Sequence, residues 1–282
     1  MAARATRDGH VMARALDELR AAIESALEEG DQQRALADAR ESLRRSPDGE
    51  GHYLLGRALE VAGEPHQAED AYLDAVAIDP DHADAHLALA DARVQQMDLD
   101  DAHKHVTFAL RSDPMHAGAL HFRGCLRELR GYDEGAQRDF ASAAVLDPLN
   151  FPLPTPLDDL TVDQVVKQVL DSLHPTLQNY LANVAIIVDE MPGPEVLDEI
   201  PHAHPFELLG SFSGPSLAES DGLQPATAWS AIPPTISIYR RNLQRFADGP
   251  DHLVEELRIT LLHEIGHFLG LDEDDLAKRG LD

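Results

Sequence analysis

The chain has 282 residues and a formal charge of −28, because 51 acidic side chains outnumber 23 basic ones. This length suggests two domains, and a hydrophobic content of 43% supplies enough apolar side chains for two cores. The negative charge repels phosphate backbones and anionic lipids, so we expect neither nucleic acid nor a membrane among the partners.

The N-terminal residues and the cysteine content indicate a soluble, cytoplasmic protein. Met1 to Leu19 lack the apolar core of a signal peptide, and the longest apolar runs, such as Val184 to Val188, are too short to span a bilayer. Cys125 is the only cysteine, which excludes a disulfide framework and a four-cysteine metal site. We interpret Cys125 as a small core residue.

The first half of the chain is an internal repeat. An Asp-Pro pair closes three successive units, at Ile78–Pro80, Ser112–Pro114 and Leu146–Pro148, with a constant spacing of 34 residues, and a degenerate earlier copy ends at Pro47. Each unit has alanines and one bulky residue at equivalent positions: Ala68, Ala102 and Ala136; Tyr72, Val106 and Phe140; Ala75, Ala109 and Ala143. The pattern predicts two short helices per unit, with alanines at the close crossings and proline after the second helix.

These units resemble the tetratricopeptide repeat family over roughly residues 16–149. The resemblance implies an α-helical solenoid over residues 1–149, whose concave surface holds a protein partner or peptide. Seven histidines in the repeats are interpreted as solvent-facing helix positions rather than metal ligands, because no acidic or cysteine companion recurs at ligand spacing. They are His52, His82, His86, His103, His105, His116 and His121.

A proline-rich segment separates the repeats from a second domain. Three prolines between Asn150 and Leu157 prevent a continuing helix, so we assign residues 150–160 to a stiff linker and residues 161–282 to the second domain. Thr161 and Gln164 form a capping-box pattern, and apolar residues follow at helical spacing. The apolar face of this predicted helix packs either on a sheet below it or against the last repeat.

Three extended segments and a helix follow. Asn183–Asp189 is β-branched and predicts a buried strand, and Glu207–Ser213 is a second extended segment. Thr235–Arg240 alternates apolar and polar residues, which indicates a half-buried or edge strand, and we interpret Ala218–Trp229 as a loop. The last segment predicts a helix from about His252 to Leu269, ended by a glycine.

The last helix carries the sequence His263-Glu264-Ile265-Gly266-His267, which is an HExxH motif. Residues four positions apart lie on the same side of a helix, so both imidazoles can reach one metal ion. Zinc suits two imidazole nitrogens in a tetrahedral site, and Glu264 beside the first ligand suits a general base.

A catalytic zinc site needs a third protein ligand. The motif continues as HExxHxxGxxE, and the glycine lets the backbone turn sharply so that Glu273 returns toward the metal. Glu273 is the leading third ligand, while its acidic neighbours remain open alternatives on spacing alone. These neighbours are Asp272, Asp274 and Asp275.

The extended motif has the form of the metzincin signature, with a carboxylate in place of the usual third histidine and without the downstream methionine turn. Residues 160–278 resemble more closely the small bacterial zincin-like metallopeptidase family, through the segments Asn183–Glu190, Leu208–Gly214, Pro234–Arg241 and Leu261–Leu271. The resemblance implies a compact α+β zincin fold, with zinc bound by His263, His267 and Glu273 and with Glu264 as the catalytic carboxylate.

We therefore predict a zinc-dependent metallopeptidase: Glu264 takes a proton from a zinc-activated water and later protonates the leaving amine, while the repeats recruit a substrate or partner. Candidate oxyanion partners are Tyr239, Arg240, His202 and His204, although strand packing, a solvated pair of arginines and loop positions also explain them. The strand at residues 235–239 is the hypothesis for the edge that pairs with the substrate backbone.

Two other functions are consistent with the sequence. One is an interaction scaffold in which the repeats carry the function and the zinc is structural or inactive. The other is a metal-dependent hydrolase of a non-peptide amide. Glu264 favours catalysis, because a structural zinc needs no general base.

Overall fold

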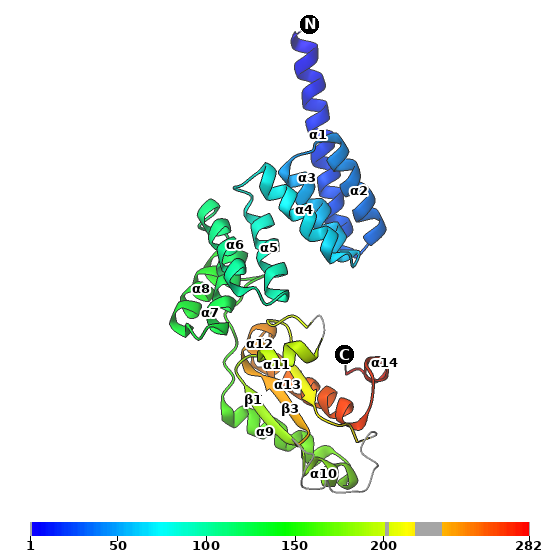
Figure 1. Cartoon of the computed structure of the whole chain (residues 1–282), viewed down its shortest axis with the longest axis vertical. Helices are drawn as coiled ribbons and strands as arrows, with labels where there is room; N and C mark the ends of the chain where they lie inside the picture. The colour runs from blue at the N-terminus through cyan, green and yellow to red at the C-terminus, as the bar shows by residue number, and fades with distance from the viewer. Residues whose placement is uncertain (1, 201–202, 218–232, 282) are drawn as a thin grey trace. The chain divides into compact units, whose positions relative to one another are not determined.

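The computed structural model describes residues 2–200, 203–217 and 233–281, with side chains from residue 14 onward. The chain divides into two compact units, residues 1–146 and residues 147–282. The first is built from helical hairpins, and the second combines helices with a three-stranded sheet (Figure 1). The predicted architecture, a helical solenoid followed by a small α+β domain, is confirmed. Among the described residues no helix has both the length and the apolar character that crossing a membrane requires.

Successive helices of the first unit pair as antiparallel hairpins (Figure 1). The predicted small residues form the interior, since Ala68, Ala102 and Ala136 are buried between helices. A carboxylate accepts the first free N–H groups of several helices, for example Asp31 before the second helix and Asp98 before the sixth. The helices are α1 (Ala2–Glu28), α2 (Gln32–Arg45), α3 (Gly49–Val61), α4 (Pro65–Ile78), α5 (Ala83–Gln95), α6 (Leu99–Ser112), α7 (Ala117–Leu129) and α8 (Asp133–Leu146).

The bulky residue of each repeat is matched by a small residue on the partner helix. A Cβ atom at Gly56 would lie 2.3 Å from the ring of Tyr72, and one at Gly124 would lie 2.6 Å from the ring of Phe140. The intervening repeat has the smaller Val106 at the aromatic position and an alanine at the glycine position. The repeats therefore keep the filled volume of the hairpin rather than the identity of the residues.

The prediction that the histidines of the repeats are solvent-facing is wrong, because none of the seven is exposed. His86 is buried, and two of the others cap helices: Nδ1 of His82 accepts the N–H of Ala85 in α5, and Nδ1 of His116 accepts the N–H of Ala119 in α7. Nε2 of His116 lies 3.0 Å from Asp84 Oδ1, in the preceding repeat. A helical periodicity does not reveal this role, because the contact joins residues of two different repeats. Cys125 is buried, as predicted.

The second unit packs its helices against a sheet with strand order β1-β3-β2. The central strand β3 runs parallel to β1 and antiparallel to β2. Of the two alternatives for residues 235–239, the edge strand is wrong, since β3 is bonded on both sides, whereas the half-buried strand agrees with the alternating burial of β3. The elements are α9 (Asp159–Ser172), α10 (Pro175–Leu181), β1 (Ala185–Asp189), α11 (Pro194–Glu199), β2 (Gly210–Ser213), β3 (Thr235–Tyr239), α12 (Arg240–Phe246), α13 (Pro250–Leu269) and α14 (Glu273–Ala277).

Helix α9 belongs to the core of the second unit, which decides between the two packing partners left open by the sequence. Its buried residues Val162, Val165 and Val169 join the apolar cluster that contains Ile236 of β3 and Leu257 of α13. The helix begins earlier than the capping-box pattern predicts, because the side chain of Asp158 accepts the N–H of Thr161. The segment 218–229, interpreted as a loop, lies outside the described residues.

Candidate metal centre

The two histidines of the HExxH motif lie one turn apart on the solvent side of α13, and their rings meet edge to face. The Nε2 atoms of His263 and His267 are 2.9 Å apart. The carboxylate of Glu273, in the first turn of α14, lies 3.3 Å from Nε2 of His267 and 3.7 Å from Nε2 of His263. One ligand atom from each of the three residues falls within 4.8 Å of the others. In the described part of the chain they are the only group of three such residues that could hold a metal ion.

Two of the three acidic neighbours of Glu273 have other partners. Asp272 caps α14, since its side chain accepts the N–H of Asp275. Asp275 in turn forms ion pairs with Lys278 and Arg279. The carboxylate that lies beside the two imidazoles is that of Glu273, three residues after the glycine.

A sharp turn and one packing contact bring Glu273 back to α13. Gly270 ends the helix in the left-handed conformation, with φ of 90°, and the N–H of Leu271 bonds to the carbonyl of Gly266. Leu276 of α14 is fully buried and lies against Gly266, where a Cβ atom would come within 2.3 Å of Leu276 Cδ2. Gly266, between the two histidines, therefore leaves the space into which Leu276 of α14 packs.

Backbone carbonyls fix the tautomer of both histidines. Nδ1 of His263 lies 2.5 Å from the carbonyl oxygen of Leu281, and Nδ1 of His267 lies 3.2 Å from that of Leu271. A carbonyl oxygen only accepts hydrogen bonds, so each Nδ1 carries the proton and each neutral ring presents a lone pair at Nε2. The Nε2 atoms are 2.9 Å apart, and two neutral rings at this distance need a cation between or beside their lone pairs to offset the repulsion. The donor set fits zinc, which accepts two imidazole nitrogens and a carboxylate.

Glu264 is buried directly beside these ligands, with 5% of its surface exposed. Burial raises the pKa of Glu264 to about 8, and the negative charge of Glu273 adds to the shift. A hydrogen bond from the backbone N–H of Phe212, on β2, opposes it. A cation at the histidines would favour the charged carboxylate.

Two family models match the chain. Residues 49–92 match the tetratricopeptide repeat, and residues 181–281 match the zincin-like metallopeptidase. The chain carries a tetratricopeptide repeat and a zincin-like metallopeptidase domain. No curated protein matches the sequence.

Several solved structures of repeat proteins are similar to the chain. PilF of Pseudomonas aeruginosa is 18% identical, with a TM-score of 0.45, and the match covers 56% of this chain and 70% of that one. A thermophilic tetratricopeptide repeat protein of Thermus thermophilus is 19% identical, with a TM-score of 0.44, covering 59% and 87%. YrrB, described as a repeat protein with an unusual peptide-binding site, is 20% identical, with a TM-score of 0.37, covering 52% and 84%.

Among the described residues, the free edge of the sheet beside α13 belongs to β2, not to β3 as the sequence analysis proposed. The N–H of Tyr239 bonds to the carbonyl of Leu209, so the alternating pattern of an antiparallel pair directs the backbone of Gly210 and Phe212 away from β3. The N–H of Phe212 reaches Glu264, which places this edge against the candidate base. Sequence analysis missed β2 as this edge because the strand is only four residues long.

The proposed oxyanion partners have other contacts. The hydroxyl groups of Tyr239 and Ser211 are 2.6 Å apart inside the domain, and burial raises the pKa of Tyr239. Arg240 forms ion pairs with Asp159 and Glu190, so the interpretation of a solvated arginine pair is wrong. His204 Nδ1 accepts the N–H of Phe206 in a local turn, and His202 lies outside the described residues.

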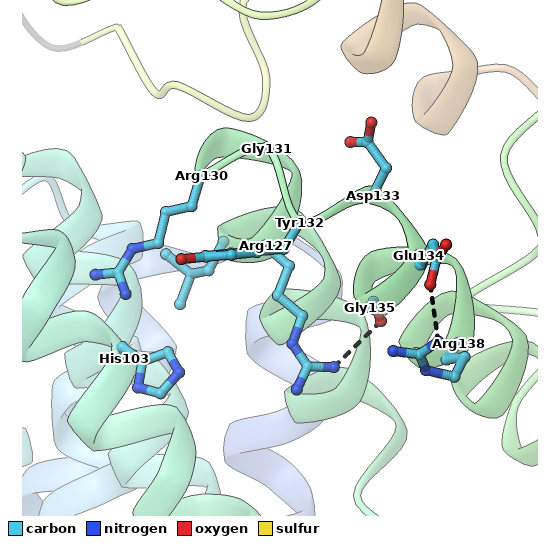
Figure 2. Close-up of a pocket in the computed structure, with 10 residues that line it drawn as sticks. His103, Arg127, Arg130, Gly131, Tyr132, Asp133, Glu134, Gly135 and Arg138 are labelled. Atoms are coloured by element: carbon cyan, nitrogen blue, oxygen red, sulfur yellow. Dashed lines mark hydrogen bonds and ion pairs between the residues drawn. The ribbon is translucent and has the colours of Figure 1, made fainter.

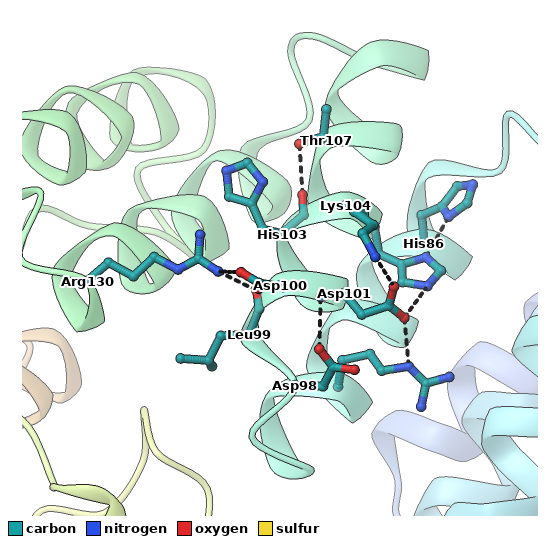
Figure 3. Close-up of polar contacts among 11 residues, drawn as sticks. His86, Asp98, Leu99, Asp100, Asp101, His103, Lys104, Thr107 and Arg130 are labelled. Atoms are coloured by element: carbon teal, nitrogen blue, oxygen red, sulfur yellow. Dashed lines mark hydrogen bonds and ion pairs between the residues drawn. The ribbon is translucent and has the colours of Figure 1, made fainter.

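The repeats contain a cavity of about 700 Å³ around the turn between α7 and α8. Figure 2 shows the side chains of Arg127, Arg130 and His103 around it. These arginines already have partners: Arg127 binds Asp139 and the carbonyl of Gly135, and Arg130 binds Asp100 and the carbonyl of Leu99 (Figures 2 and 3). The arginines of this cavity are paired with carboxylates or carbonyls, and among the described residues it contains no group of metal ligands. The metal centre is therefore the better candidate for the functional site.

Proposed function

We propose that this protein is a zinc-dependent peptidase, with zinc held by His263, His267 and Glu273 and with Glu264 as the general base. One observation carries the proposal. Carbonyl oxygens lie beside Nδ1 of both imidazoles, which leaves both Nε2 atoms for a metal, and these atoms and a carboxylate oxygen of Glu273 lie within 4.8 Å of one another. This is the donor set of a catalytic rather than a structural zinc site, since three protein ligands leave one position open.

The residues around that point have the properties that peptide hydrolysis needs. Zinc, when bound, acts as a Lewis acid toward a peptide carbonyl and lowers the pKa of water toward about 7. Glu264 is positioned to accept a proton from water and to deliver it to the departing amine. Its burial keeps bulk water from competing for that proton. Apart from the Phe212 N–H that bonds to Glu264, the outer edge of β2 would offer its backbone groups to an extended peptide.

The repeats supply the second part of the proposed function. Solenoids of stacked repeats offer an extended concave surface for binding, and we propose that these repeats recruit the substrate or a partner that presents it. This role is independent of the metal, so removal of the repeats is expected to weaken substrate capture without changing the zinc content.

Metal analysis tests the zinc site. The purified wild-type chain is expected to contain about one zinc ion, and His263→Ala is expected to contain none, because two remaining ligands do not hold zinc against buffer. His66→Ala is the matched control, since His66 is an exposed histidine of α4. Equal zinc content in the wild type and His263→Ala would refute the proposal.

Cleavage of a peptide library tests the catalytic role. Glu264→Gln keeps the size of the side chain but cannot take a proton, so it should retain zinc and lose about 100-fold or more in kcat. If the wild type and Glu264→Gln both bind zinc and are equally inert, the interaction-scaffold interpretation replaces the peptidase.

A further inference from the structure

A cavity of about 290 Å³ opens beside the candidate metal centre, entirely within the second unit. His263 and Glu264 form part of its wall, so a group bound there lies next to the proposed reacting atoms. Gly210, on the free edge of β2, forms another part. A peptide extended along that edge would therefore place one side chain in the cavity, since successive side chains of a strand alternate between its two faces.

The remaining wall is mostly apolar. Leu208 and Leu209 precede β2, Ile259 comes from α13, and Leu281 comes from the segment after α14. Phe246, the last residue of α12, also lines the cavity, although 54% of its surface is exposed. An apolar stem bound here would cover side chains that otherwise contact water, which stabilises the complex.

Two further carboxylates line the same cavity. Glu256 lies on α13 about two turns before Glu264, and its side chain is only 17% exposed. It contacts Nε2 of His252 at 3.1 Å. Glu207, just before β2, is exposed. None of the described residues lining the cavity is a lysine or arginine, and His263 presents its Nε2 lone pair to the metal site.

We propose that this cavity is the substrate side-chain pocket of the peptidase and that it selects lysine or arginine. The long apolar stem of either residue would contact Phe246 and Ile259, and its cationic end would reach the carboxylates of Glu256 and Glu207. An acidic side chain would meet two like charges in a chain whose net charge is −28. The inference rests on the proposed function, because it concerns the substrate of that site.

Binding to a zinc-loaded Glu264→Gln variant tests the selection without cleavage. The probes are fluorescent alanine-rich peptides that differ at one position, which holds lysine, norleucine or glutamate. We expect the lysine peptide to bind about tenfold more tightly than the norleucine peptide, and the glutamate peptide to bind most weakly. Norleucine matches the stem of lysine without its charge, so the ratio isolates the carboxylates.

Variants in the same background locate the effect. Glu256→Gln should bring the lysine-to-norleucine ratio close to one, and Glu256→Lys should invert the order so that the glutamate peptide binds best. Glu255→Gln is the matched control, because Glu255 precedes Glu256 on α13 but pairs with Arg258 outside the cavity. Its ratio should equal that of the parent.

The outcomes separate this inference from the proposed function. A wild-type chain without zinc or without peptidase activity refutes the proposed function. A chain that binds zinc and cleaves peptides, yet binds the lysine and norleucine peptides equally, refutes only the basic pocket. An unchanged ratio in Glu256→Gln refutes it as well.

Discussion

Each unit of the molecule contains two histidines whose ring nitrogens meet at hydrogen-bond distance, but only one of these pairs is suited to a metal. In the repeats, Nδ1 of His86 lies 3.0 Å from Nδ1 of His105. In the zincin-like domain, Nε2 of His263 lies 2.9 Å from Nε2 of His267. Distance alone does not distinguish the two pairs.

The groups behind the rings distinguish them. His86 donates through Nε2 to the carbonyl of Pro80, so its Nδ1 accepts a hydrogen bond from Nδ1–H of His105 and each of these nitrogens has a partner. Asp101, whose carboxylate lies 3.7 Å from Nε2 of His105, is already bound by Lys104 (Figure 3). It also accepts a hydrogen bond from Arg93. Burial lowers the pKa of both histidines, which keeps them neutral.

In the zincin-like domain both rings donate to carbonyls through Nδ1, so two neutral rings would both present a lone pair, and no proton, at the gap between their Nε2 atoms. The carboxylate of Glu273 lies beside that gap and is 76% exposed, so it is free to bind a cation. The comparison teaches that the second hydrogen bond of each imidazole and an available carboxylate identify a metal site, whereas proximity of two histidines does not.

Removing the available carboxylate should have the largest effect. Glu273→Ala is expected to raise the Kd for zinc about 100-fold or more, because only two ligands remain. Loss of a direct ligand should weaken binding more than the roughly 10- to 100-fold loss seen when a group that only supports a ligand is removed. Competition with a chromophoric chelator measures the Kd. Asp274→Ala is the control, one residue away on the same helix, and should bind zinc as the wild type does. An equal loss in both variants would show that general negative charge, not ligation by Glu273, attracts the ion.

Displacing α14 without touching a ligand should have the next largest effect. Gly266→Ala places a methyl group against Leu276, whose Cδ2 lies 2.3 Å from the position of the added Cβ. We expect α14 to move and the zinc Kd to rise about tenfold, in line with a strain of about 1–3 kcal/mol from overpacking.

A compensating substitution checks that steric cause. Leu276→Ala removes the clashing atoms, so the double variant Gly266→Ala with Leu276→Ala should bind zinc more tightly than Gly266→Ala alone. If the double variant binds zinc no better than Gly266→Ala, the contact between Gly266 and Leu276 does not position the third ligand.

The sequence predicted those features that depend on neighbours in the chain. The 34-residue recurrence of Asp-Pro revealed the helical repeats, and the spacing of His263, His267 and Glu273 indicated which groups to expect together. The glycine turn after α13 follows from a local conformational preference, and the structure has it with φ of 90° at Gly270. Local patterns carry this information because a helix fixes the relative positions of residues three and four apart.

Features that depend on distant partners were missed or wrong. The alternation in β3 is compatible with an edge or a central strand, and only its pairing with both β1 and β2 decides. The contact between Nδ1 of His263 and the carbonyl of Leu281 cannot be predicted from the pattern of side chains, because every residue has a backbone carbonyl. The histidine caps of the repeats were missed for a related reason, since His116 is recognised by Asp84 in another repeat.

The hydrogen-bonded pair of His86 and His105 should make the stability of the repeats sensitive to acid. The pKa of His105 is lowered by burial and then by His86, so its contribution to stability is present above the unfolded value near 6.5 and is lost as the pH falls through the folded pKa. His105→Gln removes this titration. When the pH falls from 7.5 to 5, the free energy of hydrogen-exchange protection in α5 and α6 should decrease less in His105→Gln than in the wild type, by on the order of 1 kcal/mol. Hydrogen exchange of the intact chain measures it, and equal losses would contradict the assignment.

The bridge between His116 and Asp84 should show the opposite dependence on pH, with a smaller size. The hydrogen bond to Asp84 raises the pKa of His116, so its stabilisation is fully present below the unfolded value near 6.5 and is lost as the pH rises through the folded pKa. His116→Asn keeps a residue that caps helices well but is too short to hold the bridge. The measurement compares the free energy of protection of α7 in the wild type and in His116→Asn. The advantage of the wild type should be larger at pH 5.5 than at pH 8.5, by about 0.5 kcal/mol. The effect is small because Asp84 is more than half exposed, so water screens the ion pair. The same difference at both pH values would mean that His116 acts only as a cap, and the charge on its ring would then have no part in joining the repeats.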